Sequence, residues 1–273
     1  MTSPAVRAPR VRPARGRGFG RTRAFAGIGA AAAALVPFEL AMRRISPNNR
    51  PRVPWLFHRA LARSLGINVV VHGRQERRGG VLFVANHVSW ADIPVMGSNI
   101  LAAFVAKSEV AGYGPVGWLS TLSRTVYVER DRRQKTAAAR NAIVERLAAG
   151  ENVILFPEGT NSDGVTVLPF KSALFAAIEG PGCEDFIIQP VAIAYTRLNG
   201  IPITRERLPD IAWIGDTALA PHMLSFMSLG KVRAELRFFP PVRVTDFADR
   251  KALALHCHQV IADGYRKMMR GEA

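Results

Sequence analysis

A histidine and an aspartate five residues apart, His87 and Asp92, are the strongest candidates for chemistry in the chain. Residues 81–85 are all apolar and predict a buried strand, and His87 lies in the polar turn that follows it. We expect Ser89 to cap the next helix and Asp92 to occupy its third position, near the positive end of the helix dipole. A carboxylate there can accept a hydrogen bond from one ring nitrogen of His87 and leave the other nitrogen as a general base. The alternative is a simple capping box beside a polar loop histidine.

A second segment has the same order of apolar strand and polar turn. Residues 152–156 predict a strand, and the turn after it contains Glu158, Gly159 and Thr160. Together, the segments from Asn86 to Asp92 and from Phe156 to Thr160 resemble the glycerolipid acyltransferases of the lysophosphatidic-acid acyltransferase type. Two weaker blocks follow the family order: a strand that ends at Arg130, and the segment 189–193 that contains Pro190. The resemblance spans about residues 67–195.

The resemblance implies transfer of a fatty acyl group from an acyl thioester to the free hydroxyl of a lysolipid. His87 would take the proton of that hydroxyl as it attacks the thioester carbonyl, and Asp92 would fix the ring tautomer and stabilise the imidazolium. The resemblance implies 1-acylglycerol-3-phosphate as the first expected acceptor of this chain, which gives phosphatidic acid in phospholipid biosynthesis. No Gly-x-Ser-x-Gly segment occurs in the sequence, so we expect direct attack without an acyl-enzyme.

The resemblance also implies a set of substrate-binding residues. Arg130 and Lys107 would hold an acceptor phosphate, Glu158, Gly159 and Thr160 would shape the acceptor pocket, and Pro190 would begin the strand on the acyl-thioester side.

One position departs from the family pattern. A basic residue commonly follows Glu-Gly-Thr in this family, and this chain has Asn161 there. The departure favours an alternative acceptor without a bare phosphate, such as a lyso-ornithine lipid.

Alternation of apolar segments predicts an α/β fold with a mostly parallel sheet flanked by helices. The expected strands are 67–72, 81–85, 102–107, 125–129, 152–156, 187–194 and 232–239, and the expected helices of this domain are 90–100, 115–123, 133–149, 171–179 and 247–270. Active sites of such sheets lie at the carboxyl ends of the strands. His87, Lys107, Arg130 and Glu158 all lie at or just after such an end.

The N-terminal part predicts association with a membrane. The formal net charge is +16, and residues 1–23 contain seven arginines and no acid, so we expect a disordered basic tail. Residues 24–66 predict a helical membrane-associating segment, with a hairpin or interfacial helix at 24–44 favoured over a spanning one and an amphipathic helix at 52–65. The alternative is that these helices are buried against the main domain, which covers residues 67–273.

The predicted partners follow from this organisation. They are a lysolipid acceptor, acyl-CoA or acyl carrier protein as co-substrate, and an anionic membrane surface, on the cytoplasmic face of the inner membrane with the chain peripheral or single-pass. We expect no cofactor and no metal, since the two cysteines, Cys183 and Cys257, form no ligand cluster in the sequence.

The glycines at 112, 114 and 117 match a dinucleotide fingerprint but do not directly follow a strand, which argues against a nicotinamide enzyme. The non-enzymatic alternative is nucleic-acid binding through the arginine-rich tail, without specific recognition expected.

Overall fold

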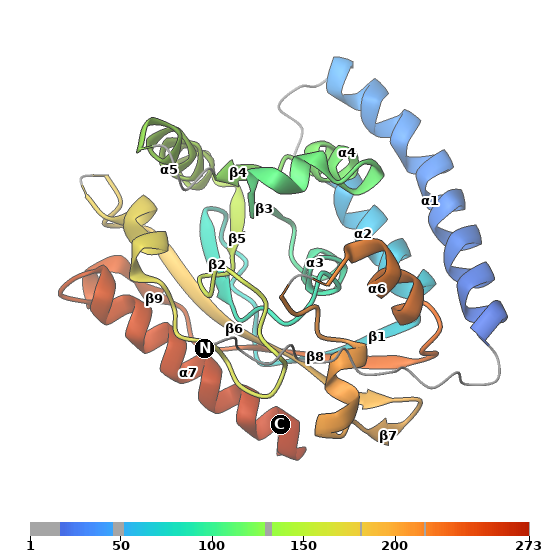
Figure 1. Ribbon diagram of the computed structural model, residues 1–273. Coiled ribbons are helices and arrows are strands. Elements are labelled where there is room, and N and C mark those ends of the chain that lie inside the picture. Colours follow the sequence, from blue (N-terminus) through green and yellow to red (C-terminus); the bar gives the residue numbers. More distant parts are fainter. Residues whose placement is uncertain (1–16, 46–51, 129–132, 181, 216, 273) are drawn as a thin grey trace, which may run out of the picture.

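The computed structural model describes residues 17–45, 52–128, 133–180, 182–215 and 217–272 (Figure 1). The strands are β1 (Ile67–His72), β2 (Val81–Ala85), β3 (Ala102–Lys107), β4 (Val126–Val128), β5 (Asn152–Leu155), β6 (Ile187–Leu198), β7 (Ile201–Pro202), β8 (Val232–Phe238) and β9 (Val242–Arg243). The α-helices are α1 (Arg17–Ile45), α2 (Arg52–Ser64), α3 (Asp92–Gly97), α4 (Pro115–Leu122), α5 (Arg133–Ala148), α6 (Leu219–Phe226) and α7 (Arg250–Arg270). Four 3₁₀ helices are described as well: η1 (Ser108–Gly112), η2 (Ser172–Ile178), η3 (Arg205–Asp210) and η4 (Val244–Asp246).

The strands of the described residues form one mixed sheet. Its order is β1-β8-β6-β2-β5-β3-β4, with β7 and β9 paired to β6. Neighbours in this order are parallel, except that β8 runs antiparallel to β6, and β7 and β9 are antiparallel to it too. All five residues of β2 are buried, as expected for a central parallel strand covered on both faces. The predicted α/β fold with a mostly parallel sheet is confirmed.

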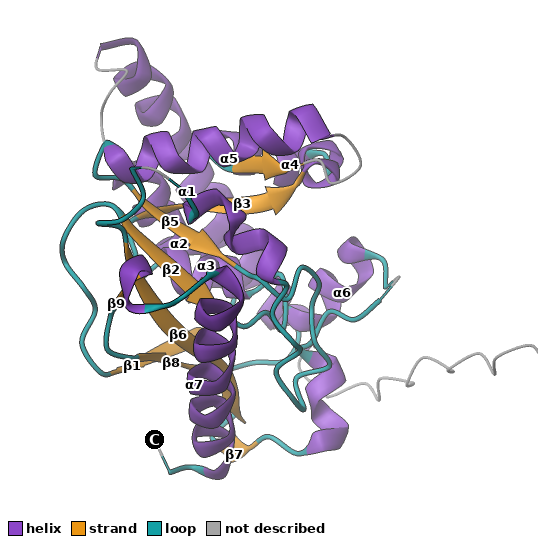
Figure 2. Ribbon diagram, turned by 90° about the vertical axis from the view of Figure 1, so that its left-hand side faces the viewer, coloured by secondary structure: helices purple, strands orange, loops and turns teal. Residues whose placement is uncertain are grey.

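Helices cover both faces of this sheet. Figure 2 shows α7 across one face, with α2 and α3 behind the other. Helix α7 begins after Asp249, whose carboxylate accepts hydrogen bonds from the backbone N–H groups of Lys251 and Ala252. It ends at Gly271, which has the left-handed backbone (φ 76°) of a helix C-cap. The cap at Asp249 explains why the helix starts at Arg250, slightly later than the sequence pattern predicts.

The register of the central strands determines which loops meet. Strand β2 pairs in parallel with β5, with Val84 opposite Leu155, and with β6 on its other side. The loops that follow β2 and β5 therefore leave the sheet side by side at the same edge. These are the loops that contain His87 and Glu158.

Helix α1 differs from its prediction. It is one helix of 29 residues that continues through Pro37, so of the two forms expected at 24–44, a hairpin or an interfacial helix, the hairpin is wrong. Its start at Arg17 also means that the expected tail does not extend to residue 23. A tertiary contact stabilises this first part, because Nε of Arg21 donates hydrogen bonds to the carbonyl oxygen of Leu224 and to Oγ of Ser228 near α6.

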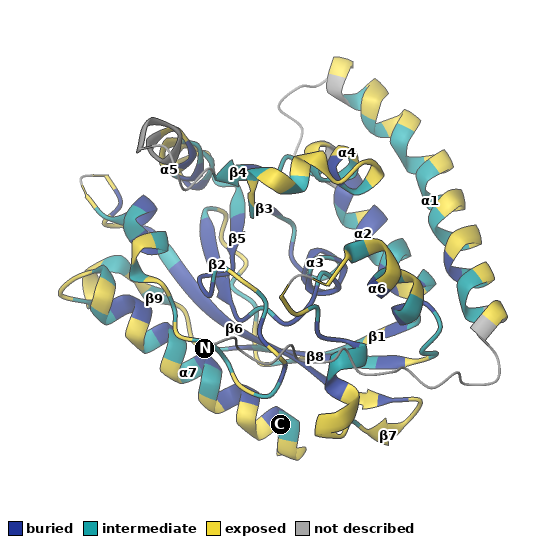
Figure 3. Ribbon diagram, viewed as in Figure 1, coloured by how far each residue is buried: buried dark blue, intermediate teal, exposed yellow. Residues whose placement is uncertain are grey.

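Exposed and half-buried residues alternate along α1, which packs along α2 (Figure 3). Residues 20–42 are long and apolar enough to cross a membrane, and none of the most apolar window is buried. Phe25 and Phe38 are 56% and 55% exposed. Helix α1 is therefore not the ordinary buried helix that the sequence left as an alternative.

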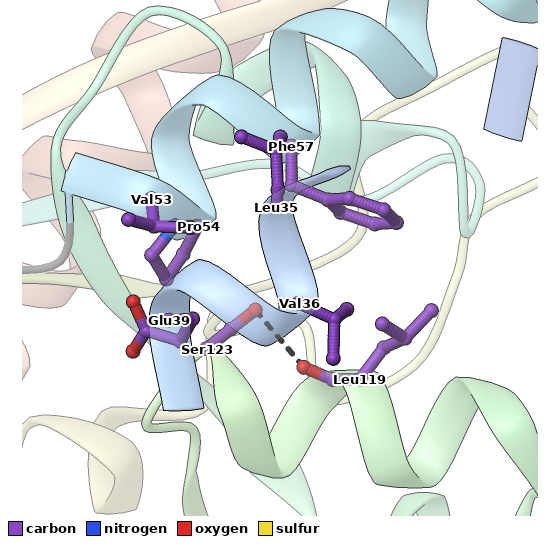
Figure 4. Close-up of a pocket in the computed structure, with 8 residues that line it drawn as sticks. All are labelled: Leu35, Val36, Glu39, Val53, Pro54, Phe57, Leu119 and Ser123. Carbon is purple, nitrogen blue, oxygen red and sulfur yellow. Dashed lines mark hydrogen bonds between the residues drawn. The ribbon is translucent and has the colours of Figure 1, made fainter. Parts of the chain in front are cut away.

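An apolar pocket lies where α1, α2 and α4 meet (Figure 4). It is lined by Leu35, Val36, Glu39, Val53, Pro54, Phe57, Leu119 and Ser123. The hydroxyl of Ser123 donates to the carbonyl of Leu119 within α4, which leaves mainly hydrocarbon facing the pocket. No residue that lines it belongs to the predicted catalytic or binding set.

Candidate active site

His87 and Asp92 form the predicted pair. Nδ1 of the His87 ring lies 2.7 Å from Oδ2 of Asp92. The Asp92 side chain is fully buried, whereas that of His87 remains 17% exposed. A carboxylate accepts and cannot donate, so Nδ1 carries the hydrogen of this bond and Nε2 carries the free lone pair in the neutral ring. The arrangement leaves Nε2 to act as a general base.

The loop between the two residues differs from its prediction. Helix α3 starts at Asp92 itself, and Ser89 does not cap it. The carboxylate instead turns back and accepts hydrogen bonds from the backbone N–H groups of Val88 (2.7 Å) and Ser89 (3.0 Å). Within the described residues, the buried hydroxyl of Ser89 has no hydrogen-bond partner. Asp92 therefore shapes the loop that presents His87, in addition to holding the ring.

The other oxygen of Asp92 is bonded to a residue that the sequence did not indicate. The buried hydroxyl of Tyr195, on β6, donates to Oδ1 of Asp92 over 2.7 Å. Burial raises the pKa of Tyr195 well above its usual value, and the negative charge of Asp92 raises it further, so the hydroxyl stays a donor. Alternation along β6 places Tyr195 on the same face as Val191 and Ile193, which was the only signal in the sequence.

Glu158 joins the two loops. Its carboxylate accepts from the backbone N–H of His87 (2.8 Å) and from that of Leu168 (3.1 Å). The carbonyl of His87 in turn accepts from the N–H of Ser162 (2.8 Å), so the peptide groups on both sides of His87 are bonded to the second loop. Burial raises the pKa of Glu158 to about 8; the two backbone hydrogen bonds lower it, and the charge of Asp92 raises it. With 1% of its surface exposed, Glu158 is placed to organise the site from within.

The ring of Phe156 covers one face of His87. The two ring centroids are 4.2 Å apart and the planes are inclined by 16°. Phe104 stacks behind Phe156 at 6.4 Å. An aromatic face attracts a cation, so this stack favours the imidazolium that forms when His87 takes up a proton. The sequence had indicated Phe156 as the last residue of a strand and the first of the second family segment, without a role beside His87.

Asn86 fixes the end of β2 to β6. Its side-chain amide donates to the carbonyl of Ile193 (2.9 Å) and accepts from the N–H of the same residue (2.8 Å). The Asn86 side chain thus takes the place of a main-chain partner for Ile193, just after the end of β2. It thereby holds the His87 loop against the strand that carries Tyr195.

The other predicted binding residues differ in burial and in their positions on the loops and strands. Gly159, half-buried, follows Glu158 with a left-handed backbone (φ 69°), and Thr160 is exposed beside it. Lys107 is exposed at the end of β3. Pro190 is buried as the fourth residue of β6 and does not begin that strand, which starts earlier because residues 187–189 already pair with β2. Arg130 lies outside the described residues. The binding roles of these residues remain predictions.

Other sequence features have a structural explanation. Helix η1 separates β3 from the glycines at 114 and 117, so a strand does not lead directly into that fingerprint. Cys183 and Cys257 are both free and buried. Among the described residues, no group of three or more histidines, cysteines and acids is arranged to hold a metal ion.

Comparison with known proteins shows the family to which the chain belongs. The family model described as Acyltransferase matches residues 68–194, which include both loops. A lyso-ornithine lipid O-acyltransferase of Brucella abortus is 43% identical over 224 residues, covering 81% of this chain and 84% of that protein. The chain belongs to this acyltransferase family.

One further sequence relative and one solved structure are also similar to this chain. A 1-acyl-sn-glycerol-3-phosphate acyltransferase of Neisseria meningitidis is 32% identical over 209 residues, covering 76% of this chain and 78% of that protein. The crystal structure of the 1-acyl-sn-glycerophosphate acyltransferase PlsC from Thermotoga maritima superposes with a TM-score of 0.64 at 22% identity, covering 92% of this chain and 97% of that one. This likeness confirms the fold.

Proposed function

We propose that this acyltransferase moves a fatty acyl group from an acyl thioester to the free hydroxyl of a lyso-ornithine lipid. The observation that carries the catalytic part is the 2.7 Å bond between the buried Asp92 carboxylate and Nδ1 of a partly exposed His87. The acceptor is suggested by the relatives, since proteins named as lyso-ornithine lipid O-acyltransferases match at 43% and 38% identity.

The reaction uses His87 first as a base and then as an acid. Nε2 takes the proton of the acceptor hydroxyl while the oxygen of that hydroxyl attacks the carbonyl carbon of the thioester. Asp92 stabilises the imidazolium so formed, and Phe156 adds the attraction of its ring face. The tetrahedral intermediate then expels the thiolate, which takes the proton from the imidazolium. An ester and a free thiol result, and His87 returns to its neutral form.

Asn161 supports an acceptor without a bare phosphate. Its amide nitrogen is buried and has no hydrogen-bond partner among the described residues. An arginine or lysine at this position would bring a positive charge suited to a phosphate. The neutral amide provides no such charge.

A second acceptor, 1-acylglycerol-3-phosphate, is supported by the Neisseria relative at 32% identity. The two acceptors are separated by measuring kcat/KM for each with purified enzyme, using labelled acyl-CoA and acyl carrier protein as donors. We expect the higher value for the lyso-ornithine lipid. Asn161→Arg should shift the ratio toward the phosphate acceptor, and Thr166→Arg, at an exposed position of the same loop outside the predicted binding set, serves as its charge-matched control. If the wild-type enzyme has the higher kcat/KM for 1-acylglycerol-3-phosphate, that lipid is the acceptor and the lyso-ornithine lipid is not.

The place of the reaction follows from α1 and from the donors. Helix α1 presents an apolar surface that suits the membrane in which the lysolipid resides. Acyl thioesters are cytoplasmic molecules, so the proposed location is the cytoplasmic face of the inner membrane.

A further inference from the structure

Tyr195 is the residue of the site that none of the sequence motifs contains. It is 1% exposed and lies on β6, whereas His87 and Asp92 come from the loop and helix that follow β2. Its hydroxyl donates to Oδ1 of Asp92 over 2.7 Å. The donors from Val88, Ser89 and His87 all reach the other oxygen, Oδ2.

This division of donors has a mechanical consequence. Three hydrogen bonds on one oxygen leave the carboxylate free to tilt about that point, and a fourth on the other oxygen prevents the tilt. Because β6 is a central strand of the sheet, the fourth donor comes from a rigid element. The Asn86 side chain bonds both main-chain groups of Ile193, two residues before Tyr195, and so sets the distance between β6 and the His87 loop.

The division also has an electrostatic consequence. A hydroxyl that donates to a carboxylate draws part of its negative charge away from the imidazole. Asp92 then binds the proton of the imidazolium less tightly, and that proton returns more readily to the leaving thiolate. Among the described residues, the other ionisable groups that interact with Asp92 are Glu158, in the second loop, and Tyr265, on α7. Tyr265 donates its hydroxyl to the carbonyl of Gly164 and not to Asp92.

We propose that Tyr195 is a positioning residue for acyl transfer, which orients the Asp92 carboxylate and moderates its hold on the proton that His87 takes up. This inference rests on the proposed roles of His87 and Asp92. It does not depend on which lysolipid is the acceptor.

The test removes the hydroxyl and keeps the ring. Tyr195→Phe should lower kcat about 10- to 100-fold, as expected for one lost hydrogen bond to a charged group, with KM for the lysolipid little changed. The acid limb of the kcat/KM against pH profile should move to higher pH, because the less solvated carboxylate holds the imidazolium proton more tightly. Tyr265→Phe is the matched control: it removes an equally buried hydroxyl that does not touch Asp92, and it should leave the acid limb in place.

A second variant covers the case in which Tyr195→Phe does not fold. Replacement of Tyr195 by 3-fluorotyrosine keeps the hydrogen bond and makes the hydroxyl a stronger donor. The acid limb should then move to lower pH, opposite to the phenylalanine variant. An unchanged profile in both variants, or an equal shift in Tyr265→Phe, would overturn the proposal. A wild-type enzyme inactive on every lysolipid would instead reject the proposed function.

Discussion

The loop around His87 and the helix α1 use their residues in opposite ways. In the loop, the side chains of His87 and Asp92 bond to each other over 2.7 Å. The main-chain N–H groups of residues 87, 88 and 89 and the carbonyl of residue 87 also have hydrogen-bond partners within 3.0 Å. Helix α1 extends over 29 residues, and its only fully buried side chain is that of Ala24 among those described. The loop fixes a few atoms in place, whereas the helix offers a broad apolar surface. Substitutions in the first should change the rate of chemistry, and substitutions in the second should change access to lipid.

The largest expected effect is in the loop. His87→Ala should reduce kcat by up to about 10⁴-fold, because the general base is lost. The fold should persist, since the backbone N–H that Glu158 binds is retained. The measurement is acyl transfer with labelled thioester, with circular dichroism as the control for folding. Near-wild-type turnover in this variant would exclude His87 as the base.

The next effect tests the charge of Asp92 separately from its shape. Asp92→Asn can still accept hydrogen bonds at the Oδ2 position, and the Tyr195 hydroxyl can turn to accept from the new amide group. The imidazolium loses its counter-charge, so kcat should fall about 10²- to 10³-fold. Comparing kcat with the melting temperature separates the two roles. A lower melting temperature with unchanged turnover per folded molecule would mean that Asp92 only shapes the loop.

Substitutions on the exposed surface of helix α1 should change the apparent KM for the lysolipid acceptor. The double variant Phe25→Glu with Phe38→Glu places two negative charges on its exposed surface. With acceptor in anionic vesicles, the apparent KM should rise about tenfold or more, and binding to the vesicles should weaken. Transfer to a short-chain lysolipid below its critical micelle concentration should keep its kcat. Leu255→Glu on α7, where the side chain is 56% exposed, is the matched control. An equal effect of the control would show that α1 has no special role.

The smallest expected effect concerns the pH dependence of stability. Glu158 has an ordinary pKa of 4.5 when unfolded and about 8 in the folded chain. The folded state therefore binds the proton more tightly, and this contribution to stability is complete below pH 4.5 and is lost as the pH rises toward 8. Glu158→Gln does not titrate. The melting temperature of the wild type relative to this variant should fall by at least about 2–4 °C between pH 5 and pH 9. A wild-type melting temperature that rises relative to that of Glu158→Gln as the pH increases would contradict the raised pKa of Glu158.

Much of the fold was predictable from periodicity. The apolar runs of β2 and β5 and the alternating helices defined the sheet. Every strand predicted for the main domain is present, and all but β6 lie within one residue of their expected bounds. The extension of β6 to Leu198 was not predicted, because its last residues pair with β7 and β8 and pairing is invisible in a single sequence.

The site was predictable only where its residues are close in sequence. His87 and Asp92 lie five residues apart, so local geometry was enough to predict their bond. Tyr195 is 103 residues from Asp92, and its contribution depends on the order of the strands. The predicted role of Ser89 was wrong. The Asp92 carboxylate accepts from the backbone N–H groups of Val88 and Ser89, and the helix begins only at Asp92, so the Ser89 hydroxyl does not cap it.

The bonding of the His87 peptide to the second loop has a consequence for protein engineering. A designer who transplanted residues 86–92 alone onto another sheet would leave an N–H and a carbonyl beside the imidazole without Glu158 and Ser162. The smallest portable unit of this catalyst is therefore two loops on neighbouring parallel strands, and libraries that vary one loop should vary its companion at the same time.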